Sequence, residues 1–283
     1  MREINRVMVI GAGMMGAEIA YCCAASGCQV MLKDVNQELS DAGIARISKI
    51  LDKLISKGKI DTSGKGEIID KIRATDQYDG VEDVDLVIEA VLENYDIKSR
   101  VFKELSDHIN DDCIVATNTS AISITKLATN VKTPQNVVGM HFFSPASVMK
   151  LVEVIPGLET SNKVIESVKS FCQRIGKEPI KVRECVGFVV NRVLHALIKE
   201  AVRLVEEGIA TPEDIDKAMK LGLGHPVGPF QLMDLVGNDL ALANFETLFN
   251  EYGERFRPAP LLKRKVYANH LGRKSKKGWL VYE

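Results

Sequence analysis

The stretch from Ile4 to Ala20 reads INRVMVIGAGMMGAEIA and decides the fold. An apolar strand runs into Gly-x-Gly-x-x-Gly and directly into a helix of small residues, a pattern typical of sites that hold a dinucleotide pyrophosphate. Gly11 permits the tight turn, Gly13 lets backbone N–H groups approach the phosphates, and Gly16 lets the helix pack closely on the strand. We expect the pyrophosphate at this turn and at the positive end of the helix, on Gly11, Gly13, Met14, Met15 and Gly16.

An acidic residue ends the second predicted strand, which covers residues 29–33. Asp34 follows Gly16 by 18 positions, where a carboxylate accepts hydrogen bonds from the adenosine ribose hydroxyls. Its charge would repel the extra phosphate of NADP, so the sequence predicts NAD as the cofactor. The adjacent Lys33 leaves NADP open, and a purely structural glycine turn is the alternative to the whole motif.

Composition argues against several classes of protein. The 283 residues carry 37 basic and 38 acidic side chains and a net charge of −1, which argues against a nucleic-acid or membrane surface. No apolar run reaches the ~18 residues that span a bilayer, and the first strand begins by Ile4, so we expect a cytoplasmic protein without a leader. The six cysteines lack C-x-x-C spacing, which predicts reduced core thiols and no metal site.

Strand and helix patterns alternate up to about residue 184, which predicts an α/β fold, a Rossmann-type, doubly wound parallel sheet. Later strands are expected over 84–90, 113–117, 136–140, 150–155 and 179–182, with a helix over 37–58, a break at Gly64 and Gly66, and a short helix to 71. Beyond 184 the pattern is helical, and the predicted helix 187–208 has more apolar positions than one packing stripe needs. We therefore predict a dinucleotide-binding domain over 1–184 and an all-helical C-terminal domain over 185–283 for substrate contacts and formation of a homodimer or larger homo-oligomer.

Polar side chains follow two predicted strands at the sheet edge where α/β folds bind ligands. One cluster is Thr117–Ser120, and the other begins at His141. Oxidation of a secondary alcohol needs a base for the hydroxyl proton and a carboxylate that orients the base and supports its cationic form. His141 can be that base and Glu153, in the next strand, that carboxylate. A hydrogen-bonded core histidine and a solvent-facing glutamate are the alternatives.

Six further motifs occur in both predicted domains: Asn118–Ser120, Gly139–Phe143, Val148–Val154, Gly187–Arg192, Asp216–Met219 and Pro226–Phe230. Together they resemble the L-3-hydroxyacyl-CoA dehydrogenases. The resemblance implies reversible, NAD-dependent oxidation of an (S)-3-hydroxyacyl-CoA with a short acyl chain, such as hydroxybutyryl. It implies His141 as general acid and base with Glu153 as its partner, and two residues that hydrogen-bond the substrate, Ser120 and Asn191.

The resemblance also implies contacts at the nicotinamide half of NAD. Glu93, Lys98 and Lys274 would lie there, although the residues alone suggest only solvated charges. Ser120 and Ser144 are expected at the same end of the cofactor.

Four positions depart from the usual family pattern. Ser144 replaces a usual Asn and Ser147 a usual Pro in the loop after His141, while Lys276 and Trp279 replace a usual Gly and Phe. Cofactor affinity or acyl preference could therefore differ from that of other members.

A basic stripe marks the helix 37–58. Its members recur at three- and four-residue spacing and so share one face: Arg46, Lys49, Lys53 and Lys57. Such a stripe neutralises the phosphates of CoA, although an ordinary solvated face has the same pattern. Because the resemblance places CoA against a helical hairpin at about 37–71, we favour Lys53 and Lys57.

Two other functions stay open. One is a dehydrogenase of a CoA-free hydroxy acid or sugar acid, as in lambda-crystallin-like relatives, which would not need the basic stripe. The other is a non-catalytic NAD-binding relative, which would not need Ser120, His141, Glu153 and Asn191 together.

Overall fold

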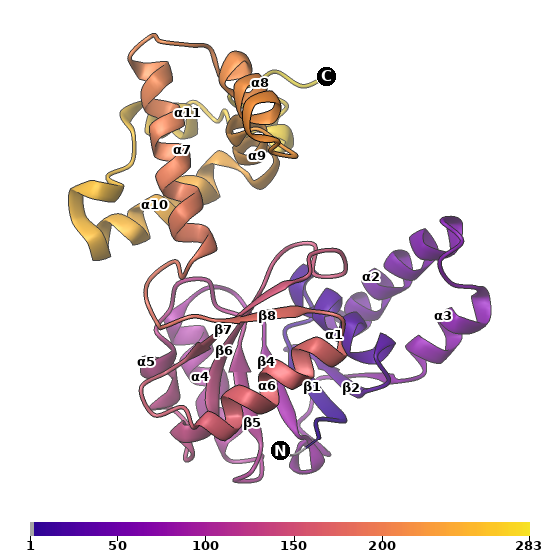
Figure 1. The fold of residues 1–283 in the computed structure, drawn as a ribbon. Coiled ribbons are helices and arrows are strands. Elements are labelled where there is room, and N and C mark those ends of the chain that lie inside the picture. The colour runs from indigo at the N-terminus through magenta and orange to yellow at the C-terminus, as the bar shows by residue number, and fades with distance from the viewer. Residues whose placement is uncertain (1–2) are drawn as a thin grey trace. The chain divides into compact units, whose positions relative to one another are not determined.

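The computed structural model describes residues 3–283, which divide into two compact units (Figure 1). The first unit ends at Cys185 and the second begins at Val186. Among the described residues, no helix has the length and apolar character needed to cross a membrane.

The first unit is built on one sheet of eight strands in the order β3-β2-β1-β4-β5-β6-β7-β8. The strands are β1 (Arg6–Ile10), β2 (Gln29–Lys33), β3 (Ile72–Thr75), β4 (Leu86–Glu89), β5 (Ile114–Thr117), β6 (Val137–Phe142), β7 (Leu151–Pro156) and β8 (Glu178–Lys181). Neighbours pair in parallel except β6 and β7, which are antiparallel and place His141 directly opposite Glu153.

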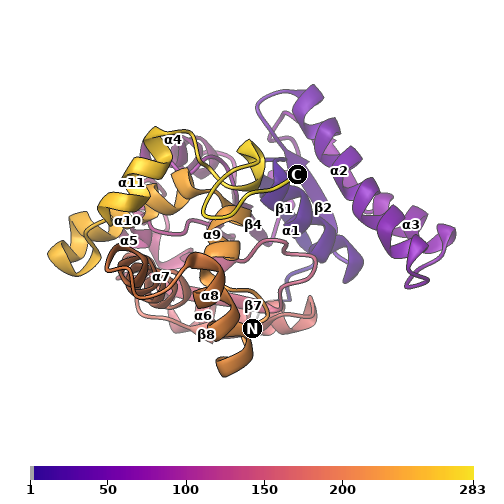
Figure 2. The same ribbon diagram turned by 90° about the horizontal axis from the view of Figure 1, so that it is seen from above.

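Helices connect and cover these strands. They are α1 (Met14–Ala25), α2 (Gln37–Ser56), α3 (Thr62–Ile69), α4 (Tyr95–Ser106), α5 (Ile124–Ala128) and α6 (Asn162–Arg174), with short 3₁₀ turns η1 (Val81–Asp83) and η2 (Pro134–Asn136). Figure 1 shows α6 in front of the sheet and α4 and α5 behind it, while α2 and α3 project from it as a hairpin, also seen from above in Figure 2. The apolar sheet positions, such as Val9, Leu32 and Val138, are fully buried against these helices.

Three details of this unit differ from what the sequence indicated. Strand β3 was not predicted because Ile72-Arg73-Ala74-Thr75 has only a weak apolar pattern. Gly64 and Gly66 lie within α3 rather than in a break, since Asp61 caps that helix by accepting from the Gly64 N–H. The sheet is not wholly parallel, because the short connection over residues 143–150 returns the chain antiparallel.

The second unit is helical. It contains α7 (Val190–Glu206), α8 (Pro212–Leu223), α9 (Pro229–Val236), α10 (Asn238–Tyr252) and α11 (Pro260–Tyr267), with 3₁₀ turns η3 (Gly253–Phe256) and η4 (Arg273–Ser275). Helix α7 begins later than expected because Gly187 and Phe188, with φ of 74° and 45°, form a left-handed turn before it. Phe230, Phe245 and Trp279 are buried at its core.

Five of the six cysteines are buried, and Cys185 is partly exposed. Burial raises the pKa of the Cys172 thiol to about 12 and that of Cys23 well above its ordinary value. These core thiols therefore stay protonated near neutral pH.

Candidate active site

The glycine-rich turn has the geometry of a pyrophosphate cradle. Gly11 has a φ of +101°, and a Cβ at Gly16 would lie 1.7 Å from the Gly11 carbonyl oxygen, so helix α1 packs directly on the turn. A Cβ at Gly13 would meet no described atom within 4 Å, so that side of the turn is open. No described side chain caps α1, whose N-terminus begins with Met14 and Met15. The turn therefore fits an anionic dinucleotide.

Asp34 stands beside this turn. Its Oδ2 accepts from the Ala12 N–H at 2.7 Å and its Oδ1 from the Val35 N–H at 2.8 Å. Lys33, the residue that left NADP open, places its ammonium 4.6 Å from the centre of the Tyr78 ring and donates to the Asp34 carbonyl at 3.3 Å. Asp34 is thus held where an adenosine ribose is expected, while the Lys33 charge is engaged by a neighbouring ring.

His141 and Glu153 form a buried pair. The distance from His141 Nδ1 to Glu153 Oε2 is 2.7 Å, and the exposed fractions of the two residues are 5% and 0%. The antiparallel register creates this contact, because directly opposite residues project from the same face of the sheet. The Phe143 ring lies 4.5 Å from the imidazole, centre to centre, and helps to exclude water. A carboxylate so placed stabilises an imidazolium when the ring takes a proton.

Ser120, Glu93 and Lys98 are brought together at the ends of β4 and β5. Glu93 Oε1 accepts from the Ser120 N–H at 2.8 Å, and its Oε2 lies 3.3 Å from Lys98 Nζ. Lys98 is only 1% exposed, so the sequence interpretation of it as a solvated charge is wrong. The loop carrying Ser120 also contacts β6, since the Asn118 side chain accepts from the Phe142 N–H at 2.8 Å.

A fully buried carboxylate under this cluster was missed. Glu89 Oε1 accepts from Lys98 Nζ at 2.7 Å, and its Oε2 accepts from Thr117 Oγ1 at 2.7 Å. Glu89 thereby anchors both Lys98 and the start of the Ser120 loop. An acidic residue ending an apolar strand was the available signal.

Ser144 is exposed, and its Oγ lies 3.9 Å from the Met14 sulfur, so the loop after β6 meets the start of α1. The structure therefore places Ser144 beside the glycine-rich turn.

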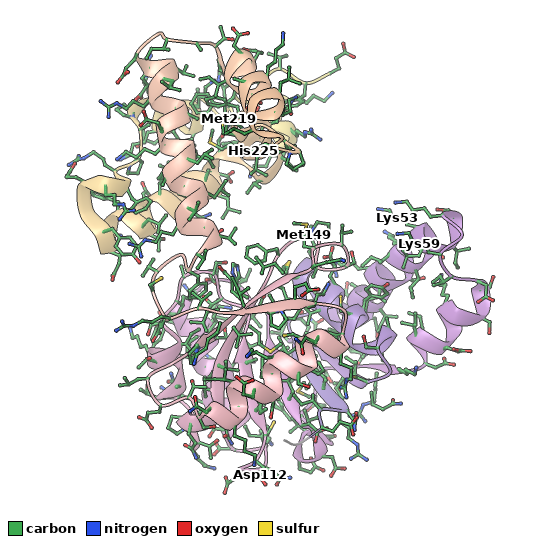
Figure 3. All side chains as sticks on the ribbon, viewed as in Figure 1. Lys53, Lys59, Asp112, Met149, Met219 and His225 are labelled. Carbon is green, nitrogen blue, oxygen red and sulfur yellow. The ribbon has the colours of Figure 1, made fainter. Side chains whose placement is uncertain are left out.

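Helix α2 carries the basic residues. Lys53 and Lys57 are exposed, and Figure 3 shows Lys53 together with Lys59 at the outer end of the hairpin. Arg46 behaves differently, because its guanidinium donates to the Ala12 carbonyl at 3.1 Å, in the glycine-rich turn. The basic stripe therefore has two parts. Arg46 contacts the glycine-rich turn, whereas Lys53 and Lys57 do not.

Asn191 and Lys274 belong to the second unit. Asn191 lies in the first turn of α7, and its carbonyl accepts from His195 Nδ1 at 2.7 Å. Lys274 Nζ lies 2.6 and 2.7 Å from the two carboxylate oxygens of Asp239, in the first turn of α10. Asp239, like Glu89, was not singled out from the sequence.

No group of three or more metal-ligating side chains occurs among residues 3–283. Within the first unit, the arrangement comprises a base with its carboxylate, the loop that carries the Ser120 hydroxyl, and a turn that fits a dinucleotide. It is suited to removal of a hydroxyl proton beside a redox cofactor.

Comparison with protein families matches both units. Residues 6–185 match the 3-hydroxyacyl-CoA dehydrogenase NAD binding domain, and residues 187–282 match the C-terminal domain of the same enzymes. The chain is 45% identical to a 3-hydroxybutyryl-CoA dehydrogenase of Clostridioides difficile, over 98% of this chain and 99% of that protein. It is 40% identical to one of Mycobacterium tuberculosis, over 99% of each.

Comparison with solved structures gives the same family. A crystal structure of (S)-3-hydroxybutyryl-CoA dehydrogenase from Ralstonia eutropha has a TM-score of 0.96 at 42% identity, covering 99% of this chain and 100% of that one. A diketoreductase described as acting on dicarbonyl compounds has a TM-score of 0.86 at 30% identity, with full coverage of both chains.

Proposed function

The chain belongs to the 3-hydroxyacyl-CoA dehydrogenase family, and on that premise we propose that its substrate pair is (S)-3-hydroxybutyryl-CoA and acetoacetyl-CoA. As a member it is an NAD-dependent dehydrogenase of 3-hydroxyacyl-CoA thioesters. The short acyl chain is favoured by its similarity to the Clostridioides difficile and Ralstonia eutropha enzymes, which carry that name. The observation that carries the catalytic assignment is the 2.7 Å contact between His141 and Glu153.

His141 performs the proton step. Because Glu153 holds Nδ1, we assign proton transfer to Nε2, which takes the hydroxyl proton during oxidation and returns it during reduction. The Glu153 carboxylate stabilises the cationic ring between these events. When bound, NAD accepts or supplies the hydride.

The remaining polar residues orient the ligands. Ser120 and Asn191 hydrogen-bond the substrate oxygen and oppose its build-up of negative charge in the transition state. The turn Gly11–Gly16 and Asp34 hold the adenosine diphosphate half of NAD. Glu93, Lys98, Ser144 and Lys274 are assigned to its nicotinamide half.

The outer end of α2 is the proposed binding site for the phosphates of CoA. Lys53 and Lys57 are exposed cations without an ion pair among the described residues, so their charges remain available to phosphates. The anionic nucleotide of CoA would be attracted to them, while the acyl thioester reaches His141.

One comparison tests the proposal. Purified protein is given acetoacetyl-CoA or free acetoacetate, each with NADH and with NADPH, and loss of the reduced cofactor is followed. We expect NADH with acetoacetyl-CoA to be strongly preferred. Equal turnover of free acetoacetate would instead favour a CoA-free dicarbonyl substrate, a possibility raised by the similarity to the diketoreductase. No turnover of either compound would mean a non-catalytic relative.

We further propose a homodimer or larger homo-oligomer in the cytoplasm. Large apolar side chains of the second unit, Leu221, Leu223, Tyr267 and Val281 among them, are 67–81% exposed. Such side chains favour burial against another subunit.

A further inference from the structure

One residue in the loop after β6 is held from two directions. The Ala146 N–H donates to the Glu18 carboxylate, and the Ala146 carbonyl accepts from the Lys177 ammonium. Lys177 Nζ also donates to the Met149 carbonyl at 3.0 Å, three residues further along the loop. Figure 3 labels Met149 on this loop.

These contacts are buried. Glu18 is 9% exposed, Lys177 6% and Ala146 0%, and the Cys22 thiol donates to the same Ala146 carbonyl at 3.5 Å. A carboxylate and an ammonium are costly to bury unless they are hydrogen-bonded. Here each ion meets a main-chain group of one loop residue, so removing that loop contact would leave a buried charge short of a partner.

Glu18 also belongs to the helix that holds the cofactor turn. It lies four residues beyond Met14 in α1, or about 6 Å along the helix axis. At the start of the same helix, Ser144 Oγ lies 3.9 Å from the Met14 sulfur. The loop therefore rests on α1 at two points, one beside the pyrophosphate turn and one a helical turn further on.

We propose that Glu18 and Lys177 are positioning residues, which fix the loop carrying Ser144 on helix α1 and so place the nicotinamide-facing side of the site relative to the pyrophosphate turn. The inference rests on NAD binding and on the proposed place of Ser144, and it does not depend on which acyl substrate is used. It also explains how a loop with Ser147 at a usual proline position is held in place.

Affinity measurements with two ligands distinguish contacts to the nicotinamide half of the cofactor from contacts to the adenosine diphosphate half. NADH and ADP-ribose, which lacks the nicotinamide, are titrated into wild type, Glu18→Ala and Glu18→Gln by calorimetry, without acyl substrate. We expect Glu18→Ala to weaken NADH binding by about tenfold, the scale of one hydrogen bond to a charged group, and ADP-ribose binding by less than about twofold. Glu18→Gln keeps an acceptor for the Ala146 N–H and should restore most of the NADH affinity.

Two further variants complete the test. Lys177→Met should repeat the selective loss of NADH affinity, whereas Glu178→Ala, at the exposed neighbouring position, should bind both ligands as wild type does. Equal loss of both ligands in Glu18→Ala would show damage to the turn or the fold, and unchanged NADH binding would show that the loop needs no such support. Either result overturns the proposal. Failure of acetoacetyl-CoA turnover alone would not affect it.

Discussion

At the scale of single residues, proton transfer depends on a pair that lies away from water. His141 and Glu153 are both at most 5% exposed, so the charge interaction between them is little screened by solvent. The carboxylate also fixes which imidazole nitrogen faces the substrate. The sequence alone suggested this pair, but it was equally consistent with a structural histidine in the core. The 2.7 Å distance between His141 Nδ1 and Glu153 Oε2 favours the pair.

Replacing the base should separate chemistry from binding. We expect His141→Gln to lower kcat by about 10²–10⁴-fold, the usual contribution of general acid–base catalysis, with NADH affinity near wild type. Steady-state kinetics and NADH titration measure the two effects. Glu153→Gln should also lower kcat, but by less, since the base remains. An unchanged kcat in His141→Gln would remove this residue from the mechanism.

At the scale of elements, the sequence predicted the helices and strands that have strong local patterns. It missed features that depend on contacts with neighbouring elements. Strand β1 and helix α1 were found from the glycine-rich motif between them, and the buried strands β4 and β5 from their apolar runs. Strand direction is not encoded in that periodicity, so β7 was assigned to a parallel sheet. The connection over residues 143–150 could have revealed the error, because a parallel crossover needs a dozen or more residues.

The hairpin of α2 and α3 makes a prediction about CoA. We expect Lys53→Ala with Lys57→Ala to raise KM for acetoacetyl-CoA by about tenfold, the sum of two exposed charge contacts, and to leave kcat unchanged. The reduction of acetoacetyl-N-acetylcysteamine, which lacks the nucleotide, should not respond. Lys65→Ala is the matched control, since its charge is already paired with Asp52 at 2.6 Å. Equal effects on both thioesters would rule out a contact with the nucleotide.

Helix α7 carries a histidine that should make stability depend on pH. Burial lowers the pKa of His195 below its ordinary value of 6.5, although its hydrogen bond to the Asn191 carbonyl opposes this. Its Nε2 has no partner among the described residues. The unfolded chain therefore takes up the proton at higher pH than the folded chain, and stability is lost as the pH falls below 6.5.

Denaturant titrations can isolate this contribution. We expect the free energy of unfolding to fall between about pH 7 and pH 5 more steeply in wild type than in His195→Phe. Leu221→Phe, at an exposed position without a titratable group, serves as a comparison and should keep the wild-type slope. Identical slopes in all three proteins would mean that His195 does not titrate differently on folding.

At the scale of the whole molecule, the division into a sheet unit and a helical unit was visible in the sequence, because strand patterns stop near Glu184. The sequence did not indicate which residues the buried or unpaired charged side chains contact. Lys98 with Glu89, Lys274 with Asp239 and Ala146 with Glu18 each join residues of different elements. Such contacts depend on the assembled fold rather than on local pattern.

The exposed apolar surface of the second unit predicts self-association. Light scattering should give a mass of twice the chain mass or more at micromolar concentration. We expect Leu221→Glu with Leu223→Glu, at 78% and 67% exposed positions near the end of α8, to reduce that mass. Lys217→Glu, exposed on the same helix, should not. A wild-type protein with the mass of one chain would contradict the prediction.

The pairing of β6 with β7 has a consequence for how such enzymes diversify. Since ladder hydrogen bonds set the spacing between His141 and Glu153, the sequence of the connecting segment can change without disturbing the acid–base dyad. A slip of one residue in either strand would instead turn one partner to the opposite face. Related enzymes can therefore differ in the sequence of this segment while they keep the same pair of residues for proton transfer.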